Sequence, residues 1–288
     1  MEIGRRDFLK LATAGVAAYT LPAFGWDPLR PLKIRQAKVK VGIEKPFTLL
    51  HVSDSHIARI DSRDTEAAYA FAKARSRMGR ELGEYYLDAA VHRARWKKTK
   101  IVHTGDFMEF MGEANLEYAA RRLCTDDFLA CVGNHEYWLD ASHRETEAYK
   151  APTIPKLKDS WAGLPASTHM IGGVNFFVFD NAFETVTEEI AAAFENAVNE
   201  ALPIVMVCHV PLWAEASGLK KNVCGLPGLK KGDAVSCAFV ERVRNEPLVK
   251  AVLAGHVHAF RKFAFSPTAV ELVAGPLFGG DCTEIEFA

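Results

Sequence analysis

Short apolar runs alternate with longer charged stretches along most of the chain. The runs are rich in Val, Ile, Leu and Phe, and their length is typical of buried strands. The pattern predicts strands at residues 38–42, 47–52, 100–104, 128–132, 174–180, 204–208, 250–254, 263–265 and 269–274.

The stretches between these runs have helical character. One or two helices are predicted within residues 64–98, and further helices at 113–123, 187–200 and 234–245. Thr187 is a suitable N-cap, and two acidic residues follow it in the first turn. Strands that alternate with helices indicate an α/β fold, and short connections between the last three runs indicate that part of the sheet is antiparallel.

Composition and charge narrow the function classes. The chain has 288 residues, of which 49% are hydrophobic, so it can bury a sizeable core. Its formal net charge is −1, whereas a nucleic-acid-binding protein usually carries a basic excess. We therefore expect no nucleic-acid-binding surface.

The first 25 residues differ from the rest. Arg5 and Arg6 are followed by Phe8, Leu9 and Lys10, and then by a run of small and apolar residues to about position 24. This pattern resembles a twin-arginine export signal, and the run is shorter than a typical membrane span. The alternatives are an uncleaved membrane anchor and the amphipathic first helix of a cytosolic protein.

The signal predicts a domain organisation and a location. Residues 1–25 form a cleavable signal peptide, 26–36 a linker and 37–288 the catalytic domain. The twin-arginine translocase is the expected export partner, and the mature chain is expected in the periplasm or cell envelope without a transmembrane helix. The six cysteines show no CxxC pair; Cys131 and Cys208 are expected to be buried, and a Cys224–Cys237 bridge is left open.

Five of the predicted strands are followed at once by polar residues of the metal-binding types. Loops at the carboxyl ends of strands gather at one edge of an α/β sheet, so these residues are expected to form one site. In chain order they are Asp54 and His56, Asp106, Asn134 and His135, His209, and His256 with His258.

Carboxylate oxygen, amide oxygen and imidazole nitrogen suit divalent ions such as Mn, Fe or Zn. Without His135, these residues supply seven such groups, which exceed the needs of one tetrahedral ion but suit two ions that share a bridging carboxylate. Two adjacent ions can stabilise both the attacking and the leaving oxygens at a phosphoryl centre. With only two carboxylates in the set, the loaded site would keep a net positive charge and attract an anion.

The order and spacing of these motifs resemble the calcineurin-like metallophosphoesterase superfamily. The matching residues are Asp54-x-His56, Gly105-Asp106, Gly133-Asn134-His135-Glu136, His209 and Gly255-His256-x-His258. The resemblance implies an α/β (α+β) fold in which a two-sheet mixed β-sandwich is flanked by helices, in four layers.

The resemblance also implies a role for each position. Asp54, His56 and His258 would hold the first metal. Asn134, His209 and His256 would hold the second. Asp106 would bridge the two ions and the hydroxide between them would attack the phosphorus, while His135 would face the phosphate and protonate the leaving oxygen.

Three residues have weaker assignments, as supporting or substrate-contacting groups. Glu136 closes the Asn-His-Glu motif. Glu109 stands three positions after Asp106, where many family members carry an acidic residue or Asn. Trp138 could line the substrate pocket or pack in the core. His51 and His103 are expected to be hydrogen-bonded core histidines.

The resulting hypothesis is an exported dinuclear-metal phosphoesterase. Its substrate would be a phosphorylated small molecule, a lipid or an envelope component, and a phosphodiester is favoured over a phosphomonoester because similar exported proteins act on diesters. The alternative is a non-catalytic protein of the cell envelope that binds a phosphorylated ligand on the same fold. A third reading is another dinuclear hydrolase, such as an amidase. Residues 213–233 are expected to form either a lid or a solvated loop.

Overall fold

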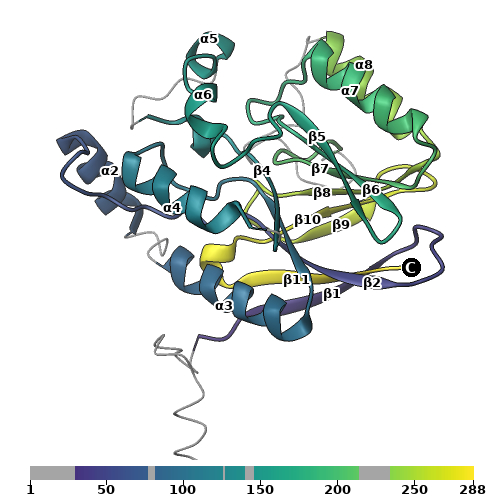
Figure 1. Cartoon of the computed structure of the whole chain (residues 1–288), viewed down its shortest axis with the longest axis horizontal. Coiled ribbons are helices and arrows are strands. Elements are labelled where there is room, and N and C mark those ends of the chain that lie inside the picture. The colour runs from purple at the N-terminus through teal and green to yellow at the C-terminus, as the bar shows by residue number, and fades with distance from the viewer. Residues whose placement is uncertain (1–29, 77–81, 126, 140–145, 214–233) are drawn as a thin grey trace, which may run out of the picture. The chain divides into compact units, whose positions relative to one another are not determined.

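Two mixed β-sheets form the centre of the computed structural model, which describes residues 30–76, 82–125, 127–139, 146–213 and 234–288 (Figure 1). The described residues do not include the proposed signal segment. They also do not include residues 214–233, among which Cys224 lies. Among the residues that are described, none of the helices combines the length and the apolar character that a membrane crossing requires.

The first sheet contains five strands. Its order is β1 (Lys33–Val39), β11 (Asp281–Phe287), β2 (Phe47–Val52), β3 (Lys100–Thr104) and β4 (Phe128–Cys131). Strands β2, β3 and β4 are parallel to one another, whereas β11 runs antiparallel to β2 and parallel to β1. The carboxyl ends of β2, β3 and β4 therefore lie at one edge.

The second sheet contains six strands. Its order is β5 (Ala166–Ile171), β6 (Val174–Phe179), β7 (Ile204–Val207), β8 (Val249–Ala254), β10 (Val270–Val273) and β9 (Arg261–Ala264). Strands β6, β7, β8 and β10 are parallel, and the two edge strands are antiparallel to their neighbours. The mixed sheets agree with the fold class that the sequence predicts.

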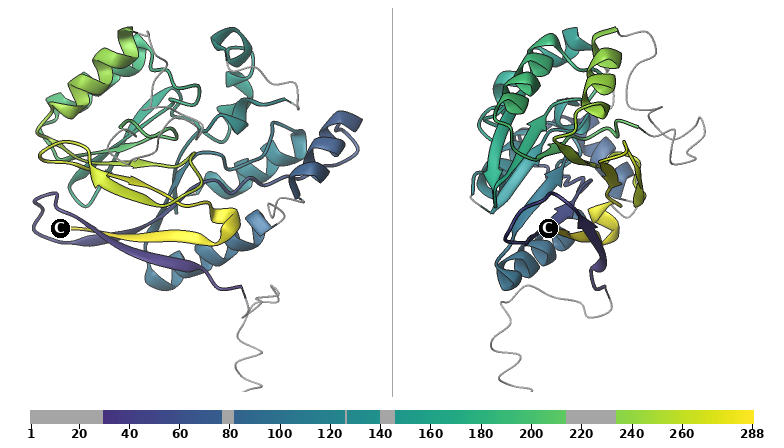
Figure 2. Two further views of the ribbon diagram at one scale, coloured as in Figure 1. Left: turned by 180° about the vertical axis from the view of Figure 1, so that it is seen from behind. Right: turned by 90° about the vertical axis from the view of Figure 1, so that its right-hand side faces the viewer.

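Helices cover the outer face of each sheet. Helices α3 (Gly83–Lys97) and α4 (Glu113–Leu123) share a core with the first sheet, and α7 (Glu188–Asn199) and α8 (Ala234–Arg244) share one with the second. Figure 2 shows the four layers from two further directions. Helix α2 (Glu66–Ser76) and the short helices α5 (Glu147–Lys150), α6 (Ile154–Leu157), η2 (His135–Tyr137) and η4 (Leu277–Gly279) complete the described elements.

The alternation of side chains along each strand explains the layering. In β2, Leu50 and Val52 face the helices while Leu49 faces the other sheet. In β6, Phe177 likewise faces α7 and Phe176 faces the first sheet. Because successive side chains point to opposite faces of a strand, strands that are buried on both faces read as continuous apolar runs. These runs are the ones that the sequence pattern identifies.

The predicted strands 47–52 and 100–104 and the helix 113–123 match the structure, and 64–98 divides into α2 and α3. The first strand was placed wrongly: β1 begins at Lys33 rather than at residue 38, within the stretch assigned to the linker, and pairs with β11. Strands β5 and β11 were not predicted. Thr187 caps α7 through a hydrogen bond from the Ile190 main-chain N–H, as expected.

Candidate metal centre

The five loops that carry the predicted ligands meet at the carboxyl-terminal edge of the parallel strands. Asp54 follows β2, Asp106 follows β3, and Asn134 and His135 follow β4 in the first sheet. His209 follows β7, and His256 and His258 follow β8 in the second. The site therefore lies where this edge of one sheet meets the same edge of the other.

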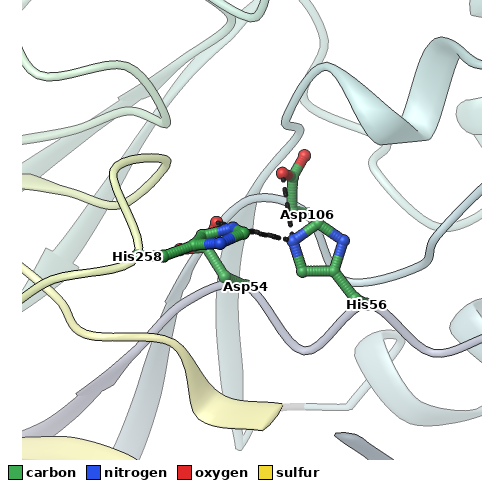
Figure 3. Close-up of side chains that lie close together, drawn as sticks. All are labelled: Asp54, His56, Asp106 and His258. Atoms are coloured by element: carbon green, nitrogen blue, oxygen red, sulfur yellow. Dashed lines mark hydrogen bonds and ion pairs between the residues drawn. The ribbon is translucent and has the colours of Figure 1, made fainter. Parts of the chain in front are cut away.

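The first cluster of donor atoms contains Asp54, His56, Asp106 and His258, all within 4.8 Å of one another (Figure 3). The Nε2 atoms of His56 and His258 are 3.0 Å apart. Asp54 Oδ1 lies 3.2 Å from His258 Nε2, and Asp106 Oδ2 lies 3.5 Å from His56 Nε2. Four potential ligand atoms thus point at one small volume.

The second cluster shares Asp106 with the first and adds His209 and His256. Asp106 Oδ2 lies 3.3 Å from His209 Nε2, which lies 3.2 Å from His256 Nδ1. Asn134, which the sequence assigns to this cluster, is buried and directly precedes η2, next to His135. Two ligand groups with one common carboxylate are the arrangement that a pair of bridged ions requires.

Hydrogen bonds at the far side of three imidazole rings determine which nitrogen faces the site. His56 Nδ1 lies 2.8 Å from Glu109 Oε2, His209 Nδ1 lies 2.7 Å from the Thr104 carbonyl, and His135 Nδ1 lies 2.8 Å from the Glu109 carbonyl. Because these oxygens only accept, each Nδ1 carries the proton. Each Nε2 is therefore directed into the site, and Glu109 supports two of the three rings.

The polypeptide reaches this arrangement through unusual backbone conformations. Of the eight described non-glycine residues with positive φ, five are predicted ligands: Asp54, His56, Asp106, His256 and His258. Non-glycine residues rarely adopt this region, and such strain concentrates at functional sites. A Cβ atom at Gly133 would collide with Asp106, which explains the glycine before Asn134.

Glu136 connects two of the loops that carry predicted ligands. Its carboxylate accepts hydrogen bonds from the main-chain N–H groups of Asp106, at 2.9 Å, of Met108, at 3.0 Å, and of Gly133. It thereby ties the loop after β3 to the loop after β4. All three of these contacts are with main-chain atoms, which agrees with a supporting role rather than a ligand role.

The electrostatics favour bound cations. Burial disfavours ionisation of the two aspartates, yet the surrounding histidines hold the pKa of Asp54 and of Asp106 below the usual range. Burial opposes protonation of His209, but the carboxylates of Asp106 and Asp54 raise its pKa to about 10. A proton on His209 therefore balances negative charge that a metal ion would otherwise neutralise, and metal binding would displace it.

One buried atom tests whether metal ions fit the site. Asp54 Oδ1 makes no hydrogen bond of normal geometry despite its approach to His258, and His256 turns its Nδ1 towards His209 in the second cluster. Burial, followed by the charge on His209, lowers the pKa of His256 to about 4, so its ring is neutral near pH 7. Unsatisfied acceptors in a buried site are costly, and coordination would satisfy them.

Aromatic rings border the site. Trp138 lies against His135 with ring centroids 3.6 Å apart, and it is buried in a small core with Phe110. Trp138 therefore packs in the core and supports His135 at the same time. Phe278, which belongs to none of the sequence motifs, contacts the His56 and His258 rings at 5.6 and 5.2 Å between centroids. No motif signal in the sequence marked Phe278.

His51 and His103 lie in the core, as the sequence predicts. His51 Nε2 is 3.0 Å from the Thr104 hydroxyl, and His103 Nε2 is 2.7 Å from the Ser55 hydroxyl. Burial lowers the pKa of both rings to about 3, so both are neutral. Cys131 and Cys208 are also buried, as expected.

Comparison with known proteins gives a family match and a fold match. The family model described as calcineurin-like phosphoesterase matches residues 47–260, which contain every predicted ligand. No curated protein matches the chain in sequence.

Several solved structures are similar to the chain at low sequence identity. A dimetal phosphatase from Danio rerio is 14% identical with a TM-score of 0.53, and the match covers 81% of this chain and 88% of that one. A phosphopantetheinyl hydrolase from Mycobacterium tuberculosis is 14% identical with a TM-score of 0.40, covering 84% and 91%. A 5′-nucleotidase from Candida albicans is 12% identical with a TM-score of 0.43, covering 86% of this chain and 47% of that one.

Proposed function

The chain belongs to the calcineurin-like phosphoesterase family, and from this premise we propose that it is an exported enzyme that hydrolyses a phosphodiester or phosphomonoester with two divalent metal ions. The observation that carries the proposal is the sharing of Asp106 by two buried donor clusters. One cluster would hold the first ion through Asp54, His56 and His258, and the other the second ion through Asn134, His209 and His256.

The bound ions would supply charge neutralisation of the phosphoryl oxygens and a water of lowered pKa. The chain's own residues position these elements. Asp106 lies between the clusters, and Glu136 holds its main chain in place. Glu109 orients His56, so that the ring presents Nε2 to the site.

His135 is the proposed proton donor to the leaving oxygen. Its Nδ1 is anchored on the Glu109 carbonyl, so a proton that it transfers resides on Nε2, 3.9 Å from Asp106 Oδ2. Burial lowers the pKa of His135 to about 3 when no phosphate is present. A phosphate dianion or monoanion beside the ring would favour the protonated form.

The finer parts of the proposal have separate support. Export is proposed from the Arg5-Arg6 pattern and the apolar run that follows. The preference for a diester is proposed from the resemblance to exported family members. The binding-protein alternative is less favoured because all seven predicted ligand positions carry metal-binding residues.

A direct assay tests the proposed activity. The full chain is stripped with a chelator, reloaded with Mn, Fe or Zn, and assayed side by side on an aryl phosphodiester, an aryl phosphomonoester and a peptide amide. We expect metal-dependent hydrolysis of both phosphoesters, with a higher rate for the diester than for the monoester. We expect no hydrolysis of the amide. Asp106→Ala should abolish turnover. A parent protein that binds phosphate but hydrolyses none of the substrates would instead favour the binding-protein alternative.

Export requires its own test. In a bacterium with a twin-arginine exporter, the full chain should be recovered outside the cytoplasm, and an Arg5→Lys/Arg6→Lys variant should accumulate inside. Equal distribution of both proteins would refute this part of the proposal and leave the enzymatic part unaffected.

A further inference from the structure

A basic and aromatic surface lies at the carboxyl end of α3, away from the metal centre. The segment from Arg93 to Lys100 contains five basic residues, no acidic residue and one tryptophan. Trp96 is 70% exposed, the highest value among the exposed large hydrophobic residues of the described chain. We call this segment, Arg93–Lys100, the α3 basic surface.

The side chains of this surface form one group. Lys97 Nζ lies 5.0 Å from the centroid of the Trp96 ring, and the Arg93 guanidinium carbon lies 6.0 Å from it. Arg93 also donates to Glu284 at 2.6 Å, and Arg95 lies 3.6 Å from Asp127. Arg93 and Arg95 thus each face an acid, and Lys97 lies beside the exposed indole.

Helix stability explains only part of this pattern. Cations in the last turn interact favourably with the helix dipole, and Arg95 and Lys97 occupy that turn. The dipole does not explain the exposed Trp96, because an uncharged apolar ring in water is not stabilised by the helix dipole.

We propose that the α3 basic surface docks the protein on an anionic lipid bilayer. An indole is apolar over most of its area and carries one polar N–H group, so it favours the headgroup level of a membrane. Lysine and arginine extend their charged ends along such a surface and are attracted to anionic lipids. The two features together match a bilayer better than a nucleic acid, since one ring at a helix end offers neither a groove nor a stacking platform.

The position of the surface determines how the docked protein is oriented. Lys100 begins β3 and Asp106 follows the end of the same strand. The two residues therefore lie at opposite edges of the sheet, separated by roughly 17 Å along the strand. Docking through α3 (Figure 1) would turn the metal centre away from the bilayer. Substrate would then reach the site from the aqueous side of the membrane rather than from within it.

Vesicle sedimentation of the full chain tests the docking. Vesicles of phosphatidylcholine with phosphatidylglycerol are compared with vesicles of phosphatidylcholine alone, which measure any baseline contributed by the rest of the chain. We expect binding to the anionic vesicles only, lost at high salt. Trp96→Ala and Lys97→Glu/Lys98→Glu should each weaken it by about tenfold or more.

The matched controls change the same residue types elsewhere. Tyr69→Ala removes another exposed aromatic ring, and Lys156→Glu/Lys158→Glu reverses two exposed charges in and just after α6. Both should bind like the parent. If the double variant at α3 loses its thermal unfolding transition, Trp96→Ala and the salt titration still decide the question.

Three results would overturn the proposal. The first is a parent chain with no preference for the anionic vesicles. The second is equal binding by the α3 variants and their controls. The third is tighter binding of a DNA or RNA oligonucleotide with the same dependence on Trp96, which would make the surface a nucleic-acid site.

Discussion

The carboxylate of Glu109 lies 2.8 Å from Nδ1 of His56. The main-chain carbonyl of the same residue accepts a hydrogen bond from His135 at 2.8 Å. One residue therefore sets the proton position on a predicted metal ligand and on the predicted acid. A carboxylate behind a ligating histidine raises its basicity and restricts its rotation.

Glu109→Gln should weaken metal binding without unfolding the protein. The variant retains the carbonyl contact to His135 but replaces the carboxylate that faces His56, so we expect affinity for the first ion to fall about 10- to 100-fold. Titration calorimetry of chelator-stripped protein measures the change. Glu117→Gln, at an exposed glutamate that pairs with Arg63, is the control, and equal affinities for both variants would contradict the role of Glu109.

His135→Gln should retain both ions and slow turnover. His135 belongs to neither donor cluster around Asp106. Its ring contacts the Glu109 carbonyl and Trp138, and its grouping with His56 and Glu109 does not include Asp106, so metal content should match the parent. Loss of a general acid costs about 10²- to 10⁴-fold, and most for poor leaving groups. A series of aryl phosphoesters with leaving groups of rising pKa measures this, and a uniform loss across the series would argue against proton donation.

Lys150→Met should destabilise the protein. Lys150 Nζ lies 2.6 Å from Asp180 Oδ2 in a buried ion pair, and Tyr137 donates a hydrogen bond to the same oxygen at 2.6 Å. Removing Lys150 leaves a buried carboxylate with neutral partners, the Tyr137 hydroxyl and the Ala182 main-chain N–H, which typically costs about 3–5 kcal/mol. Urea unfolding measures the loss; Lys156→Met, at an exposed lysine, should cost less than about 0.5 kcal/mol. Similar values for both variants would show that the ion pair does not stabilise the fold.

Glu271 should make stability depend on pH. Its oxygens accept hydrogen bonds from the main-chain N–H groups of Leu212 and Trp213 at 2.6 and 2.9 Å, but burial dominates and raises its pKa from 4.5 to about 8. Between these two values the unfolded chain releases a proton that the folded chain keeps. The stabilising contribution is therefore present at low pH and is lost as the pH rises towards about 8.

Glu271→Gln removes this proton. The free energy of unfolding of the variant minus that of the parent should increase by on the order of 2 kcal/mol from about pH 5 to pH 8. At the lower pH the variant can be less stable than the parent. Urea unfolding at the two pH values measures the difference. Glu241→Gln, at an exposed glutamate, should show no such change. A parent–variant difference that is constant with pH would refute the raised pKa.

The strands that the sequence predicts well are those whose apolar residues are buried on both faces. Phe47–Val52 and Lys100–Thr104 match because each apolar run ends directly at a polar motif. Strand β11 was missed because Asp281, Glu284 and Glu286 interrupt its pattern. Their partners are Arg35, Arg93 and Lys38, which lie far away in the chain, so no local window contains both charges.

The ligand positions could be predicted because spacing and residue type identify them locally. The support of His56 by Glu109 depends on a distance between two loops that the sequence does not encode directly. Phe278 gave no signal, since a lone aromatic residue after Gly-Pro-Leu has no defined chemistry until η4 places it beside His56 and His258. Tertiary contact, rather than pattern, defines such residues.

In the proposed enzyme one carboxylate, that of Asp106, joins two metal sites. Elemental analysis of the purified full chain, with the same analysis of Asp106→Asn and of the exposed-site control Asp159→Asn, tests it most directly. We expect about two transition-metal ions per chain in the parent and the control, and less than one in Asp106→Asn. A folded parent without bound transition metal, or an Asp106→Asn variant that keeps both ions, would contradict it.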